Sequence, residues 1–139
     1  MKKFKIAFIL ILLFCANSIY ADVPVIIEIN NVIINGGLVY IRVYFGEVSL
    51  RAAKPERLIT IEPNNVTLTH ELQLPIGEYL IAIHQDTNGN GYMDYNFLRI
   101  PQEPYGFSNL RGKIPGNFNQ MKQKISNPNE RIIIPFITY

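Results

Sequence analysis

The chain has 139 residues, a formal net charge of +2 and one cysteine. Lys2, Lys3 and Lys5 carry the excess basicity, because the remaining ten basic residues face eleven acidic ones, a net charge of −1. No basic stripe is left to neutralise a run of phosphates, so nucleic-acid binding is not expected. A single cysteine excludes disulfides within the chain and metal sites built from several thiolates.

The first 21 residues have the pattern of a secretory signal peptide. Three lysines precede an apolar run from Ile6 to Phe14, and small and polar residues follow up to Ala21. Nine apolar residues are too few to span a bilayer as a helix, and no later stretch reaches about 18. We therefore expect a secreted or periplasmic protein with no transmembrane segment after processing. Lipid anchoring at Cys15 is an alternative, although Phe14 stands where a lipoprotein signal has a small residue.

Residues 22–139 have the size of one domain, and their first half reads as β-structure. Two β-branched segments, Val23–Ile29 and Val32–Ile34, precede an Asn-Gly-Gly turn signal. Leu38–Phe45 then alternates with period two, which predicts a half-buried strand. Ala52–Arg57 contains Pro55 and predicts a loop or a short helical turn.

The second half continues the strand pattern. Leu58–Ile61 and Val66–Leu74 are extended, and Tyr79, Ile81 and Ile83 predict the inner face of the next strand. Residues 101–116 are rich in proline and glycine and predict a long connection of the kind that is often functional. The chain then offers Phe118–Ile125, as an edge strand or a brief helix, and a last strand Arg131–Thr138 with Pro135 at a sheet edge. These elements predict an all-β fold, an antiparallel immunoglobulin-like or transthyretin-like β-sandwich of about seven strands.

One loop carries a pattern that indicates calcium. Side-chain oxygens stand at positions 1, 3, 5 and 9 of the loop, and the position-7 carbonyl adds another ligand; the residues are Asp86, Asn88, Asn90, Tyr92 and Asp94. Gly91 at position 6 permits the sharp turn that such a loop needs.

The loop is not an EF-hand, because Phe97 stands where the bidentate glutamate would be. Two carboxylates and two amides predict weak affinity, with a dissociation constant on the order of 10⁻⁴ to 10⁻³ M. Glu103 is the nearest later carboxylate that can fold back to complete the shell. The alternative is an ion-free turn, since Asn-Gly pairs form tight turns without any metal.

The segment from Gly77 to Asn109 resembles a family of small exported bacterial proteins known as a domain of unknown function. The resemblance rests on Asp86-x-Asn88-x-Asn90-Gly91-x-x-Asp94, Asn96-Phe97-Leu98, Ile100-Pro101 and Glu103-Pro104-Tyr105-Gly106-Phe107-Ser108-Asn109. It implies an exported β-sandwich domain and supplies no activity.

The chain departs from that family at two positions. Family members usually have a histidine just before the first aspartate and a glycine after Asn-Phe-Leu, where this chain has Gln85 and Arg99. His84 lies one residue earlier, so its side chain falls on the opposite face of the strand. We expect His84 to be a polar residue facing solvent at a strand end, with metal ligation or acid–base work as the alternative.

The sequence favours a binding module over an enzyme, and we assign no catalytic residue. Candidate contact residues surround the calcium loop and continue beyond it; they are Tyr95, Phe97, Glu103, Tyr105, Phe107 and Asn109. The expected partner is an unidentified protein or glycan of the bacterial envelope. A carbohydrate-binding module is the alternative, followed by a hydrolase that uses Asp86 and Asp94 as a carboxylate pair. The aromatic rings can also simply cap the core.

Overall fold

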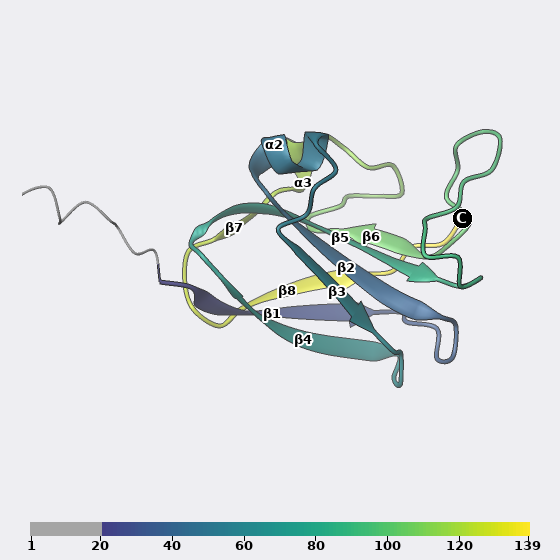
Figure 1. Ribbon diagram of the computed structural model, residues 1–139, viewed down its shortest axis with the longest axis horizontal. Helices are drawn as coiled ribbons and strands as arrows, with labels where there is room; N and C mark the ends of the chain where they lie inside the picture. Colours follow the sequence, from purple (N-terminus) through teal and green to yellow (C-terminus); the bar gives the residue numbers. More distant parts are fainter. Residues whose placement is uncertain (1–20) are drawn as a thin grey trace, which may run out of the picture.

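The structure is a computed structural model that describes residues 21–139 (Figure 1). Residues 1–20 of the predicted signal segment, which include Cys15, lie outside the described residues. The described part of the chain forms eight strands in two sheets, with two short helices. The prediction of an all-β sandwich is therefore confirmed.

The smaller sheet has the order β4-β1-β8, formed by β4 (Thr67–Leu74), β1 (Val23–Asn30) and β8 (Glu130–Pro135). The larger sheet has the order β3-β2-β5-β6, formed by β3 (Arg57–Ile61), β2 (Leu38–Phe45), β5 (Gly77–Asp86) and β6 (Tyr105–Phe107). A short strand, β7 (Gln123–Ile125), also pairs with β5. All these pairs are antiparallel except β1 and β8, which are parallel. Parallel partners need a long connection, and most of the chain lies between these two strands.

The core lies between the two sheets. The predicted alternation in β2 is confirmed, since Val39, Ile41 and Val43 are completely buried. They pack in one cluster with residues of the smaller sheet such as Ile27 and Ile134. Each such side chain contributes roughly 1.5–3 kcal/mol on burial, so this layer supplies most of the stability.

The outer face of the larger sheet is also partly covered. Two short helices, α2 (Gly46–Arg51) and α3 (Phe118–Met121), lie side by side over one end of this sheet (Figure 1). Tyr44 and Leu80 form a second buried cluster with two side chains of α3. The sequence therefore underestimates the burial of β2, because its outer face is also buried at Tyr44.

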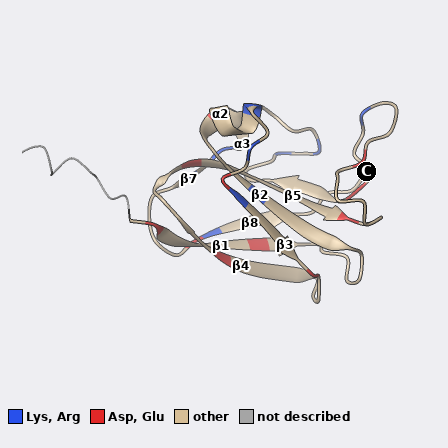
Figure 2. Ribbon diagram, viewed as in Figure 1, with Lys and Arg blue, Asp and Glu red and all other residues tan. Residues whose placement is uncertain are grey.

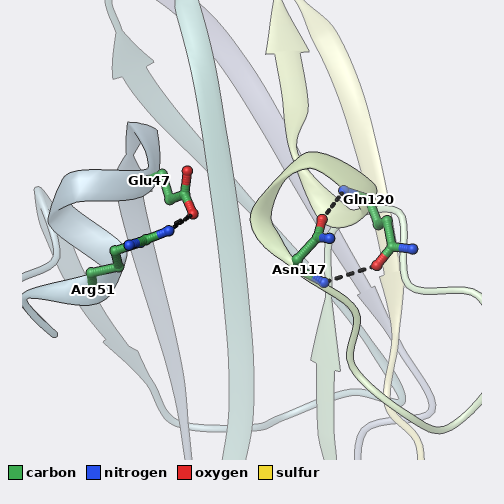
Figure 3. Close-up of polar contacts among 4 residues, drawn as sticks. All are labelled: Glu47, Arg51, Asn117 and Gln120. Carbon is green, nitrogen blue, oxygen red and sulfur yellow. Dashed lines mark hydrogen bonds and ion pairs between the residues drawn. The ribbon is translucent and has the colours of Figure 1, made fainter.

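Local contacts fix both helices (Figure 3). In α2, Arg51 Nη2 lies 2.6 Å from Glu47 Oε1 one turn away. In α3, Asn117 and Gln120 form a capping box in which each side chain bonds the other residue's backbone N–H. Both alternatives for Phe118–Ile125 occur, because the segment begins as α3 and ends as β7. The sequence prediction missed α2, which precedes the predicted loop at 52–57.

The segment Val32–Ile34 is not a strand, and this prediction was wrong. Asn31 and Asn35 have φ of 63° and 60°, so the backbone turns on both sides of the three apolar residues. Among the described residues, the segment keeps one backbone hydrogen bond to a neighbouring extended segment, from Val32 N–H to the Val66 carbonyl at 3.0 Å. Left-handed asparagines thus override the β-propensity of the segment.

The two sheets approach each other where β6 passes β8. A Cβ at Gly106 would lie 2.7 Å from the Pro135 carbonyl and 2.9 Å from the Ile134 side chain. Tyr105 and Ile137 exchange backbone hydrogen bonds of 3.1 and 2.8 Å beside this point. Glycine at 106 is therefore required by the close approach of the strands.

Charged residues are interspersed along the ribbon, with red and blue segments on both sheets and no continuous basic stripe in this view (Figure 2). Within residues 21–139, no helix is long and apolar enough to cross a bilayer.

We predict that Ser108→Ala lowers the free energy of unfolding by about 1–3 kcal/mol. The buried Ser108 hydroxyl accepts from Ile81 N at 3.1 Å and donates to the Met121 carbonyl at 2.7 Å. Its loss leaves both backbone groups buried without a partner. Urea denaturation measures the change, and the exposed Ser126→Ala serves as control, with an expected change below about 0.5 kcal/mol. Equal stability of the two variants would contradict the assignment.

Candidate functional site

The oxygen-rich loop folds around Asp86, the last residue of β5. Asp86 Oδ1 accepts from the backbone N–H of Gly89 at 2.8 Å and of Asn90 at 3.1 Å. Its Oδ2 accepts from Gly91 N at 2.7 Å. Gly91 has φ of 83°, which a side chain would strain, so the predicted role of glycine at this turn fits the structure.

The other side chains of the loop converge on Asp94. Asn88 Nδ2 and Asn90 Nδ2 lie 2.5 and 2.7 Å from Asp94 Oδ2. The two amide oxygens accept from backbone N–H groups, Asn88 Oδ1 from Asn90 N and Asn90 Oδ1 from Tyr92 N. Four side chains at the predicted positions are thus gathered at one turn.

Glu103 folds back against both ends of the loop. Its Oε1 accepts from Thr87 N at 2.7 Å and its Oε2 from Asp94 N at 3.4 Å. The side chain is buried, with 3% exposure. Glu103 therefore lies beside the loop as expected, but its oxygens bind the backbone of the loop.

The donor set fits calcium in chemistry, since carboxylate and amide oxygens are hard ligands. Among the described residues, no group of three or more His, Cys, Asp or Glu side chains is placed to hold a metal. A cation here would depend on Asp86, Asp94 and the neutral oxygens of Asn88, Asn90 and Tyr92. The two amides would have to turn, because their nitrogens face the Asp94 carboxylate.

Beside this loop lies a cavity of about 610 Å³ on the outer face of the larger sheet. Its floor is Ala82 on β5, which pairs with Arg42 on one side and Phe107 on the other. His84 and Tyr105, the next pair along the same face, line it too. The small side chain of Ala82 between larger neighbours leaves the space open.

The segments on either side of β6 and the chain end complete the cavity. The long connection predicted at residues 101–116 is not continuous, because β6 pairs with β5 in the middle of it. The cavity is lined before β6 by Met93, Tyr95, Arg99, Ile100 and Pro101, and after β6 by Lys113, Ile114 and Pro115. Tyr139 stacks on Tyr105 with ring centroids 6.1 Å apart, and the hydroxyls of both rings donate to the Lys113 carbonyl. Burial raises the pKa of Tyr105 to about 12, so this phenol stays a neutral donor.

His84 does not face solvent, and that expectation was wrong. The ring is 2% exposed and stacks on Tyr40 at 4.8 Å between centroids. Arg42 Nη1 lies 2.7 Å from His84 Nδ1, and a guanidinium can only donate, so Nδ1 is the acceptor. The proton of the neutral ring is therefore on Nε2, which is buried and has no hydrogen-bond partner among the described residues.

The predicted contact residues separate into groups. Tyr95, Tyr105 and Phe107 line the cavity, whereas Phe97 is 92% exposed and lies outside the lining. Asn109 binds the Lys122 carbonyl through Nδ2 at 2.6 Å. Glu103 holds the loop, as described above.

Arg42, Lys113 and Tyr139 line the cavity although no sequence motif marks them as site residues. Alternation puts Arg42 on the outer face of β2, and that was the available signal. Nothing in the sequence indicates that the chain end covers this face.

A family model described as "Uncharacterized protein conserved in bacteria (DUF2141)" matches residues 27–133. No curated protein and no solved structure matches the chain.

We predict that His84 titrates with a pKa of about 4. Burial is the main cause of this lowered pKa, the Arg42 charge adds to it, and Asp86 opposes it. The unfolded chain holds this proton up to pH ~6.5, so stability falls as the pH drops from there towards 4. NMR titration of the ring, assigned by its loss in His84→Gln, measures the value. A pKa at or above 6.5 would contradict the buried neutral ring.

Proposed function

The chain belongs to a family of uncharacterised bacterial proteins, DUF2141, and on that premise we propose that it is an exported, non-catalytic binding module whose Asp86–Asp94 loop is ordered by calcium. The observation that carries the proposal is the loop itself, in which Asp86, Asn88, Asn90 and Asp94 are gathered at one turn next to a cavity.

Export is proposed from the first 21 residues. Their lysines, short apolar run and small residues have the order of a secretory signal. Calcium is abundant outside cells, so a weak site can be filled in that compartment.

The position of the loop next to the cavity supports a binding role. Asp86 stands two residues after His84, and Glu103, which binds the backbone of the loop, stands two residues before Tyr105, so the loop is attached next to cavity residues on both β5 and β6. Tyr95, just beyond the loop, also lines the cavity. A cation that orders this loop would hold one side of the cavity in place.

A non-catalytic role is supported by the engagement of the polar groups. The Asp86 carboxylate accepts from three backbone N–H groups, which fit a structural or ligating role better than proton transfer. The Ser108 hydroxyl is buried and bonded on both sides. The hydrolase alternative, which needs Asp86 as a free carboxylate, is thus disfavoured.

We predict that calcium raises the melting temperature by several degrees. At a calcium concentration ten times the dissociation constant the gain is about 1.4 kcal/mol. Asp94→Asn should abolish this rise, because it removes a ligand charge and keeps the backbone contacts of Asp86. The exposed Asp22→Asn is the matched control and should retain the full response. Differential scanning calorimetry with and without ~10 mM calcium tests this, and an unchanged melting temperature of the parent protein would refute the calcium site.

Carbohydrate binding is a second candidate, favoured by the exposed rings of Tyr92 and Phe97, at 75% and 92%. Exposed aromatic faces can stack on sugar rings.

We predict that Phe97→Ala leaves the melting temperature unchanged, because the ring makes almost no buried contact. A glycan array on both proteins decides the role of the ring. Glycan binding lost in the variant supports this second candidate, and equal or absent binding in both proteins rejects it.

A further inference from the structure

We propose that the cavity over Ala82 binds a small molecule with an apolar body and one anionic head, such as a carboxylate. The inference rests on the proposed binding role and names its ligand class, and it does not depend on calcium. Apart from its cationic residues and His84, the lining is aliphatic and aromatic.

The apolar part of the cavity selects the body of the ligand. Ala82 and Phe107 form the floor, and Ile100, Pro101 and Ile114 line the sides from the segments before and after β6. The volume of about 610 Å³ lies within the range of ordinary small-molecule sites, roughly 300–1,000 Å³. An apolar ligand gains affinity there by leaving water.

The charges select the head. Three cations, Arg42, Arg99 and Lys113, line the cavity, and no Asp or Glu side chain is among the lining residues. Within the described part of the chain, none of the three forms an ion pair with an acidic side chain. Arg42 uses one of its donors for His84 and lies over the Tyr40 ring at 5.4 Å, so further donors remain for an anion.

His84, which also lines the cavity, adds a buried donor beside Arg42. Arg42 fixes the ring with Nδ1 as acceptor, which leaves the Nε2 proton buried and without a partner. An unmade buried hydrogen bond is costly, and a small shift of the ring towards an oxygen in the cavity would satisfy it. The donors of this region therefore match a ligand head that only accepts hydrogen bonds, such as a carboxylate.

The lining argues against a sugar in this cavity. Among the lining residues there is no Asp, Glu, Asn or Gln, the side chains that accept from sugar hydroxyls. A cationic ligand is disfavoured by the three positive side chains. A body with many hydroxyls would leave donors unsatisfied against Phe107 and Ile114.

The test uses three probes with one tail and different heads: decanoate, decanol and decyltrimethylammonium, all below their micelle concentrations. Isothermal titration calorimetry on residues 22–139 is expected to show decanoate binding about tenfold or more tighter than decanol. Decyltrimethylammonium should not bind measurably. Acetate alone should also fail, because the apolar body supplies most of the affinity.

Two kinds of variant locate the site. Ala82→Phe fills the floor and should abolish decanoate binding; Arg42→Met and Arg99→Gln should each weaken it by about tenfold. Lys124→Gln, an exposed cation of β7 outside the cavity, should bind as the parent does. Melting curves confirm that each variant is folded, and the two cation variants keep the test valid if Ala82→Phe does not fold.

Each outcome decides the inference. No decanoate binding, equal binding of the cationic probe, or full binding by folded Ala82→Phe would overturn it. Decanoate binding without any calcium response would support the cavity and reject the calcium loop. Glycan or protein binding without decanoate binding would reject this ligand class and keep the proposed binding role.

Discussion

The attachment of the end of β5 to the turn between β1 and β2 is the contact on which the site depends. The buried Gln85 side chain accepts from Ile33 N at 3.0 Å and donates to the Ile33 and Gly37 carbonyls at 2.7 and 3.2 Å. A Cβ at Gly37 would lie 1.7 Å from the Asp86 carbonyl, so this approach requires glycine. With Gln85 fixed inward, strand alternation turns His84 and Asp86 to the outer face. One buried amide thus orients both the cavity histidine and the first residue of the loop.

The segment from Glu103 to Asn109 has the same structural character. Glu103 binds the loop, Gly106 lets the two sheets meet, and Ser108 extends the β6 ladder through its side chain. Most of its polar groups are therefore satisfied within the molecule, and its contribution to a ligand would come through the rings of Tyr105 and Phe107. The specific pattern of this segment in the sequence is explained by packing to a large degree.

The sequence was sufficient for the sandwich and for the gathering of the loop side chains, because both follow from local rules. Period-two alternation identified the inner face of β2, and the spacing of Asp86, Asn88, Asn90 and Asp94 brings those side chains together within one turn. It was insufficient for the cavity, because that site joins β2, β5 and the chain end across long separations. The same limit explains His84, whose burial depends on Tyr40 and on a connection that has no regular pattern. The strand predicted at Val32–Ile34 does not form for a local reason, because the left-handed conformations of Asn31 and Asn35 outweigh the β-propensity of three β-branched residues.

The charges of the loop and of the cavity have opposite signs, and this links the two proposals physically. Asp86, Asp94 and Glu103 are negative, whereas Arg42, Arg99 and Lys113 are positive. The Asp86 charge lies close to the cavity, because Asp86 stands two residues after His84 on the same face of β5. An anion in the cavity is therefore repelled by the loop carboxylates when no cation is bound. A calcium ion in the loop would neutralise two of these charges and strengthen the attraction of the cavity for an anionic head. The same ion would order the segment that follows the loop and carries Tyr95 and Arg99. Its charge and its ordering effect would therefore both favour anion binding in the cavity.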